Sequence, residues 1–362
     1  MSGALQGVKV LEIGSYVTGP YAGMLLGDLG AEVIKVENKP YGDPFRGWGR
    51  TMLNPTFCSL NRNKKSMTLN LKTNEARDIF LRLADDADVI IENLRPGSVD
   101  GLGIGHETVR ARNPRIVYCS ISGFGSEGPY SQLPAYDTIG QAMGGLLSLL
   151  TDLDDPKPMG ISLADHLSGI FASYGILAAL HARTITGEGQ LVETSLLQSM
   201  VSFVQENAAN YFEESQVPRR DTRPRGPQAH CFVAGDGLPF VIHLSSPEKF
   251  WVGLTDAVGR PEMRDDARFA DRPARTQHYD ELHDLLADAF AAAPRDEWIS
   301  RLREEDVPCS PLNTLEEVFQ DPQVQALGMS IDLEHPGGTP VRVAGSAIRL
   351  SATPPPYHLR PP

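Results

Sequence analysis

Asp165 is the residue whose type and position most directly suggest chemistry. It lies at the predicted start of a helix, and Gly187 follows the last predicted helical residue. A carboxylate in this place meets the positive end of the helix dipole, so we expect it to stay ionised. An ionised carboxylate can attack a thioester carbonyl and form a covalent intermediate. The structural alternative is that Asp165 only caps the helix, since Ser162 stands three residues earlier at the spacing of a capping box.

The helix that begins near Asp165 combines apolar and small residues in a regular pattern. Apolar side chains recur at helical spacing and predict one buried face, namely Leu167, Ile170, Phe171, Tyr174 and Leu177. Small residues lie between them and would let a neighbouring backbone approach closely, namely Gly169, Ala172, Ser173, Gly175 and Ala178. Residues 190–194 then predict a strand, and a second helix follows.

Basic residues gather on both sides of a strand predicted at residues 67–71, in a chain of net charge −13. The run NRNKK at residues 61–65 precedes this strand, and Lys72 follows it. Such a run usually forms a solvated face. The functional alternative is a clamp for the phosphate groups of a ligand, because Lys and Arg donate charge-assisted hydrogen bonds.

Composition narrows the class of protein. The chain has 362 residues, enough for two domains, and its acidic balance lacks the overall basic footprint of a nucleic-acid-binding protein. The four cysteines form no CxxC pair, and the nine histidines form no HExxH motif, so we expect neither a disulfide framework nor a metal site. The first residues lack a signal-peptide pattern, and we expect a cytoplasmic protein that does not enter a membrane.

Strands alternate with helices through much of the chain. The predicted strands cover residues 8–13, 32–37, 67–71, 89–93 and 116–121, and the predicted helices cover residues 20–29, 73–86, 106–112 and 135–150. This alternation predicts an α/β fold with a large, doubly wound, Rossmann-like parallel sheet. In such sheets, ligands bind beyond the carboxyl ends of the strands.

The composition changes at residues 217–228, which are rich in Pro and Arg and predict an irregular linker. The predicted domains are therefore a large α/β domain at residues 1–216, a smaller α+β domain at 229–316, and a return to the large domain at 317–362. Gly235, Asp236 and Gly237 predict the turn of a hairpin in the small domain. The Pro-rich tail at residues 354–362 is expected to be poorly ordered.

Several of these stretches, in this order and at these spacings, resemble the family III CoA-transferases. That family includes formyl-CoA and carnitine CoA-transferases and α-methylacyl-CoA racemases. The resemblance extends over nearly the whole chain and implies that Asp165 is the nucleophile. It also implies that coenzyme A, as a substrate and not a permanently bound cofactor, contacts Val17, Thr18, Leu69, Asn70, Leu71, Lys72, Asn93, Leu94, Arg95, Ala135 and Tyr136.

The resemblance further implies transfer of CoA between an acyl-CoA and a small carboxylic acid, through an aspartyl anhydride and an aspartyl-CoA thioester. The tetrahedral intermediates need backbone N–H donors, which the glycine-rich loop at residues 123–128 could supply. In the family two chains interlock, so an interlocked homodimer is expected.

Two other functions are compatible with the same residues. A 2-methylacyl-CoA racemase pairs a histidine with an aspartate, but Tyr136 stands in the place of that histidine, and a phenol is a poor base at neutral pH. A non-catalytic CoA-binding protein is the second alternative, and the presence of Asp165 argues against it. A direct role for His166, which adjoins Asp165, stays open.

Overall fold

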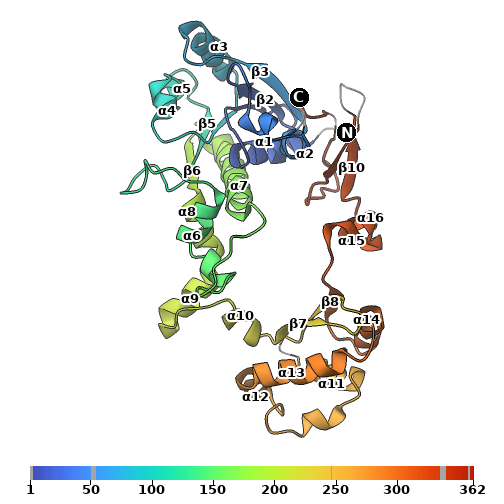
Figure 1. Cartoon of the computed structure of the whole chain (residues 1–362). Coiled ribbons are helices and arrows are strands. Elements are labelled where there is room, and N and C mark those ends of the chain that lie inside the picture. The colour runs from blue at the N-terminus through green and yellow to red at the C-terminus, as the bar shows by residue number, and fades with distance from the viewer. Residues whose placement is uncertain (1–2, 50–53, 246, 335–339, 358) are drawn as a thin grey trace. The chain divides into compact units, whose positions relative to one another are not determined.

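The computed structural model describes residues 3–49, 54–245, 247–334, 340–357 and 359–362. The chain divides into two compact units. Unit 1 comprises residues 1–148, 156–208 and 322–362, and unit 2 comprises residues 149–155 and 209–321. Each unit is described by itself below (Figure 1).

Unit 1 is built on a parallel six-stranded sheet. Its strands are β1 (Lys9–Glu12), β2 (Glu32–Glu37), β3 (Lys64–Thr68), β4 (Val89–Glu92), β5 (Val117–Ser122) and β6 (Leu191–Ser195). They are arranged in the order β3-β2-β1-β4-β5-β6. The chain therefore moves outward from β1 to β3 on one side and from β4 to β6 on the other. The loops that follow β1 and β4 consequently lie side by side at the point where the strand order reverses.

Helices cover both faces of this sheet, as the alternation of strands and helices predicts. Alternate strand residues point to opposite faces, so Val10 packs with α1 and α7 on one face and Leu11 packs with α3 on the other. The longer helices of unit 1 are α1 (Thr18–Asp28), α3 (Asn74–Asp85), α7 (Leu163–Thr186) and α8 (Leu196–Phe203). The shorter elements are η1 (Pro44–Trp48), α2 (Pro55–Asn61), α4 (Ser98–Gly101), α5 (His106–Arg110), α6 (Asp137–Met143) and α16 (Pro322–Ala326), with the antiparallel pair β10 (Ser330–Leu333) and β11 (Val341–Ala344).

Helix α7 is the one helix among the described residues that is long and apolar enough to cross a membrane by length and composition. Its residues Ala172, Ile176 and Ala179 are buried against the sheet, and the helix packs against α1 (Figure 1). This packing is that of a core helix in an α/β domain.

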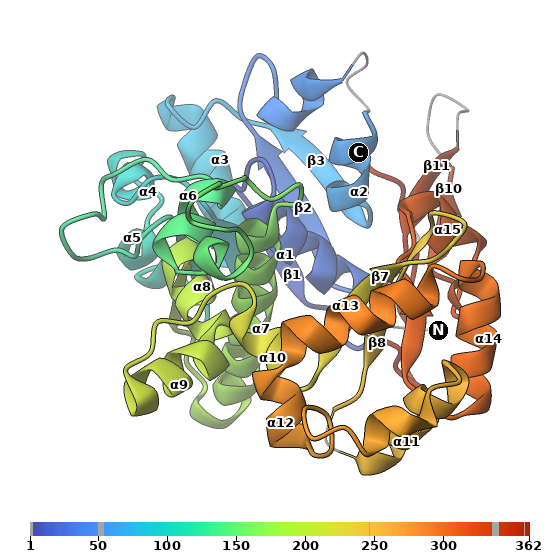
Figure 2. The ribbon, with the colours of Figure 1, turned by 60° about the horizontal axis from the view of Figure 1, so that its bottom comes forward.

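Unit 2 contains a three-stranded antiparallel sheet and several helices. The strands are β7 (Ala229–Val233), β8 (Pro239–His243) and β9 (Cys309–Pro311), in the order β7-β8-β9. The predicted hairpin is confirmed, since β7 and β8 pair across the turn that contains Gly237. Helices α11 (Glu248–Ala257), α12 (Arg272–Gln277), α13 (Tyr279–Phe290) and α14 (Arg295–Glu304) gather around these strands (Figure 2). Unit 2 also contains α10 (Thr222–Arg225), η3 (Pro261–Arg264) and α15 (Leu315–Gln320), whereas η2 (Leu147–Leu149) and α9 (Gln205–Glu214) each have residues in both units.

Three local predictions are wrong. The strand expected at residues 67–71 is β3, which begins at Lys64, because its backbone pairs with Val33 of β2 from that residue. The helix expected at residues 135–150 ends at Met143, since Gly145 follows in a left-handed conformation. The predicted irregular linker contains the single turn of α10. Leu359, in the Pro-rich tail, contacts unit 1, since the backbone N–H of Asn63 donates to its carbonyl at 2.8 Å.

Candidate active site

A pocket of about 290 Å³ lies beyond the carboxyl ends of the central strands of unit 1. It is lined from the β1–α1 loop by Ser15, Tyr16, Val17 and Thr18, and from the loop after β4 by Asn93, Leu94, Arg95 and Pro96. Further lining comes from Ile121, Ser122, Gly123, Ser131, Leu133, Pro134, Ala135, Tyr136, Asp165 and Leu196. The pocket thus occupies the reversal point of the strand order, where open α/β sheets bind ligands.

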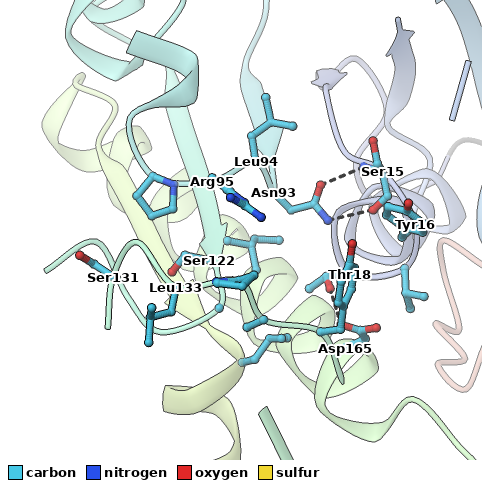
Figure 3. A pocket seen from close by; sticks show the side chains of 18 residues that line it. Ser15, Tyr16, Thr18, Asn93, Leu94, Arg95, Ser122, Ser131, Leu133 and Asp165 are labelled. Atoms are coloured by element: carbon cyan, nitrogen blue, oxygen red, sulfur yellow. Dashed lines mark hydrogen bonds between the residues drawn. The ribbon is translucent and has the colours of Figure 1, made fainter. Parts of the chain in front are cut away.

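Asn93 ties the two central loops together. Its side-chain oxygen accepts from the backbone N–H of Ser15, and its side-chain amide donates to the carbonyl of Ser15, each at 2.9 Å (Figure 3). The neighbouring Glu92 accepts from the backbone N–H of Leu94 at 2.8 Å and from the hydroxyl of Ser120. Burial raises the pKa of Glu92 to about 7, although both of these hydrogen bonds oppose the rise.

Asp165 is the third residue of α7 and faces this pocket. Its Oδ1 accepts a hydrogen bond from the hydroxyl of Thr18 at 3.0 Å (Figure 3). Its backbone N–H donates to Oδ1 of Asp137 at 3.2 Å, so α6 and α7 are joined here. The capping alternative is wrong, because Ser162 makes no side-chain cap hydrogen bond and the carboxylate of Asp165 is bound to Thr18 of another helix.

The helix start does not keep the pKa of Asp165 at the value of an exposed aspartate. Burial raises the pKa of Asp165 to about 6, the hydrogen bond from Thr18 lowers it, and the negative charge of Asp137 raises it further. Desolvation of a carboxylate disfavours its charged form, and it is the largest of these effects. At neutral pH the carboxylate is still mostly ionised, and it is more basic than an exposed aspartate.

Close packing of α1 against α7 brings Thr18 to Asp165. A Cβ atom on Gly169 would lie 3.0 Å from the carbonyl oxygen of Thr18, so only glycine fits comfortably there. The small residues predicted to admit a neighbouring backbone do so at this contact. Gly123 has a similar role, since a Cβ there would lie 2.4 Å from the Cβ of Ala135 and would displace the segment that carries Tyr136.

The structure brings together seven of the eleven residues predicted to contact coenzyme A. Val17, Thr18, Asn93, Leu94, Arg95, Ala135 and Tyr136 line the same pocket as Asp165. The other four, Leu69, Asn70, Leu71 and Lys72, lie outside this lining, in the loop that follows β3. Their position beyond the carboxyl end of β3 is at the same edge of the sheet.

The basic run at residues 61–65 does not form a free cationic surface. Arg62 is buried and donates to Asp28 at 2.6 Å. Lys64 is also buried, and its ammonium lies 2.7 Å from Oε2 of Glu12. The phosphate-clamp interpretation is therefore wrong for these two side chains, and Lys72, which is exposed, is the nearby cation that stays available.

Sequence reasoning missed Tyr16, an aromatic residue in the lining of the pocket. The ring of Tyr16 lies 5.4 Å from that of Phe45, 6.0 Å from that of Trp48 and 6.1 Å from that of Tyr136. The signal available in the sequence was that Tyr16 directly precedes the predicted contact residues Val17 and Thr18 in the same loop. Nothing local marked Trp48, because its approach to Tyr16 depends on the fold.

The structure limits the roles of two candidates named from the sequence, the glycine-rich loop and His166. Within the glycine-rich loop, Gly123 lines the pocket, whereas the backbone N–H of Gly125 is bound to the hydroxyl oxygen of Ser122 at 2.9 Å. His166 is absent from the pocket lining. Its Nδ1 lies 2.7 Å from the carbonyl oxygen of Ser162, and its ring packs 4.7 Å from that of Tyr21.

Comparison with known proteins places this geometry in a family context. The family model described as CoA-transferase family III matches residues 5–362. A succinyl-CoA–D-citramalate CoA-transferase of Chloroflexus aurantiacus is 35% identical over 359 residues, which cover 97% of this chain and 88% of the relative. The succinyl-CoA:glutarate CoA-transferase of Mus musculus is 36% identical over 364 residues, covering 97% of this chain and 83% of the relative.

Solved structures agree with these sequence relatives. The crystal structure of a CAIB/BAIF family protein from Brucella suis aligns with a TM-score of 0.88 at 34% identity. The alignment covers 100% of this chain and 96% of that one. The likeness therefore extends over both units and not only over the sheet that bears the pocket.

Proposed function

The chain belongs to CoA-transferase family III, and we propose that it transfers coenzyme A between an acyl-CoA and a carboxylic acid through covalent intermediates on Asp165. The observation that carries the proposal is the position of the Asp165 carboxylate. This carboxylate lines a pocket at the point where the strand order of the sheet reverses. Its pKa is raised, and the hydroxyl of Thr18 orients it. A carboxylate so placed can act as a nucleophile toward a bound thioester.

In the proposed reaction, the Asp165 carboxylate attacks the thioester carbonyl of the donor. The carbon–sulfur bond breaks, which gives an acyl-aspartyl anhydride and CoA thiolate. The thiolate then attacks the aspartyl carbonyl, which gives an aspartyl-CoA thioester and releases the donor acid as its carboxylate. An anhydride and a thioester are thus formed in turn on one side chain, and each step exchanges bonds of similar energy.

The second half of the proposed reaction repeats these steps with the acceptor. Its carboxylate attacks the aspartyl thioester, which gives a new anhydride and CoA thiolate. The thiolate attacks the acceptor's carbonyl in that anhydride, and the new acyl-CoA leaves as the Asp165 carboxylate is regenerated. Thr18 holds one oxygen of that carboxylate, which leaves the other oxygen to attack.

The substrate class proposed here is a dicarboxylate pair. Support comes from the relatives, several of which are named as CoA-transferases of succinyl-CoA with glutarate, D-citramalate or mesaconate. Arg95 is an exposed cation in the lining of the pocket and could face a substrate carboxylate or a phosphate of CoA. The racemase alternative has no comparable support.

The test is to trap the intermediate. The protein is incubated with succinyl-CoA and each of glutarate, D-citramalate and mesaconate, and free acids and CoA esters are followed by mass spectrometry. Hydroxylamine added during turnover should convert Asp165, and no other carboxylate, to its hydroxamate. Asp165→Asn should lose turnover by at least about 10⁴-fold while CoA still binds, because the covalent route is removed. Near-normal turnover of Asp165→Asn with a verified substrate pair would contradict the mechanism.

We also propose that the chain acts as an interlocked homodimer. Support comes from apolar side chains left exposed on α7, where Ile170, Tyr174 and Ile185 are 43%, 71% and 77% exposed. Such side chains on a core helix are typical of surfaces that another chain covers. Sedimentation equilibrium at low micromolar protein should detect dimer without monomer, and a folded, active monomer would contradict this assembly.

A further inference from the structure

Four charged side chains are buried together beneath the loop that carries Thr18. Lys35 lies 2.7 Å from Glu12 and 2.8 Å from Asp43, and Lys64 lies 2.7 Å from Glu12. None of these side chains has any solvent exposure. We call these four residues the buried ion cluster. Its two cations and two anions are balanced, which such burial requires.

The buried ion cluster holds the backbone on the near side of Thr18. The ammonium of Lys35 donates to the carbonyl of Gly14 at 2.8 Å. Oδ1 of Asp43 accepts from the backbone N–H of Tyr16 at 3.2 Å. Tyr16 has a φ of 63°, a left-handed conformation that a tyrosine rarely adopts, so the loop needs support from outside itself.

The same cluster reaches the first turn of α1. Lys64 donates to the carbonyl of Pro20 at 2.6 Å. A Cβ atom on Gly23 would lie 2.3 Å from Oε2 of Glu12, so α1 admits the cluster only because glycine stands there. Bonds from one rigid group of charges therefore fix the chain on both sides of Thr18.

We propose that Lys35 is a positioning residue for the transferase reaction, because it holds residues 14–17 in the conformation that keeps the Thr18 hydroxyl on Asp165. This inference rests on the proposed role of Asp165. Three groups act on the Asp165 carboxylate, namely the hydroxyl of Thr18, the negative charge of Asp137 on α6 and His166 on α7. When Thr18 is displaced, its hydrogen bond no longer offsets the rise in the pKa of Asp165 that burial and Asp137 cause. The acid limb of the pH profile of kcat/KM should then move to higher pH.

The test is a double-mutant cycle between Lys35→Met and Thr18→Val. Each single variant should lower kcat roughly tenfold and move the acid limb to higher pH, because the loss of one hydrogen bond to a charged group has about this size. If Lys35 acts through Thr18, the loss of kcat in the double variant is no larger than the loss in the less active of the two single variants. Lys65→Met is the matched control, since Lys65 lies on the neighbouring strand β3 and pairs with Glu32 of β2 at 2.6 Å on the exposed side.

A second variant guards against failure to fold. Lys35→Met leaves two buried anions with one cation, whereas Glu12→Gln combined with Lys35→Met removes one charge of each sign. The charge-balanced variant still lacks the bond to Gly14 and should show the same shift of the acid limb. Additive losses in the cycle, or an unchanged acid limb in either folded variant, would overturn the inference. Retained turnover in Asp165→Asn would instead refute the proposed function.

Discussion

Two carboxylates in unit 1, the fully buried Glu12 and the partly buried Asp165, have opposite electrostatic surroundings. Burial raises the pKa of Glu12, but the charges of Lys35 and Lys64 exceed this effect and hold the pKa below its usual range. Burial also raises the pKa of Asp165, and the hydrogen bond from Thr18 offsets this only in part, so the value stays near 6. The nearby cations decide this difference, because Glu12 is the more deeply buried of the two and still has the lowered pKa.

This contrast separates a structural role from a chemical one. The carboxylate of Glu12 is bound by two ammonium groups, so its oxygens are committed to ion pairs. The carboxylate of Asp165 has one neutral donor and faces a pocket, so it is basic and accessible to a substrate. Environments that push the pKa values of carboxyl groups apart are typical of sites that perform covalent or acid–base chemistry.

The largest expected effect concerns the stability of the buried ion cluster. Glu12→Ala leaves two buried lysines with one carboxylate, so we expect it to lower the free energy of unfolding by about 3–5 kcal/mol. Glu32→Ala removes an exposed pair with Lys65, and should cost less than about 1 kcal/mol. Urea unfolding of both variants measures the difference. Equal losses would mean that burial does not distinguish the two ion pairs.

The next largest effect on stability is a gain and not a loss, and it concerns Asp165. The pKa of Asp165 is raised on folding, so its contribution to stability is greatest below the unfolded pKa near 4 and is lost as the pH rises through 6. Asp165→Asn should therefore stabilise the protein by about 1–3 kcal/mol at pH 8 and by little at pH 4.

Thermal unfolding of Asp165→Asn across this pH range tests the prediction. Asp85→Asn is the control, because its hydrogen bond with Arg112 lowers the pKa of Asp85, and this substitution should not stabilise the fold at pH 8. Destabilisation of Asp165→Asn at pH 8 would show that Asp165 resembles Glu12 more than we infer.

Activity should follow the same ionisation. Attack on a thioester requires the ionised form of Asp165, so kcat/KM should fall about tenfold between pH 7 and pH 5. Initial rates with a verified substrate pair measure this, with enzyme returned to pH 7 as the control for unfolding. A flat profile down to pH 5 would place the pKa of the nucleophile in the range of an ordinary exposed aspartate.

The smallest effects are expected from the cations outside the buried ion cluster. Arg95→Ala and Lys72→Ala should each raise the KM for acyl-CoA by roughly three- to tenfold with less change in kcat, because exposed cations supply mainly uniform binding. Arg110→Ala, an exposed residue of α5, is the matched control. Unchanged KM in both variants would move the CoA site away from this edge of the sheet.

Local sequence was sufficient where local chemistry decides the structure. Thr73 was predicted to begin a helix and accepts from the backbone N–H of Ala76 as its N-cap. Gly187 ends α7 in a left-handed conformation that suits glycine. The alternation of strands and helices predicted the parallel α/β sheet, and the motifs indicated the family that the comparisons confirm.

Tertiary structure decided which of these residues meet. The strand order places the loop after β1 beside the loop after β4, and only then can Asn93 hold Ser15 and Thr18 reach Asp165. Lys64, predicted to be exposed, is buried in an ion pair with Glu12, which lies on a strand distant in sequence. The physical reason is that pKa values and ion pairs depend on burial and on neighbours in space, whereas a sequence pattern specifies only neighbours along the chain.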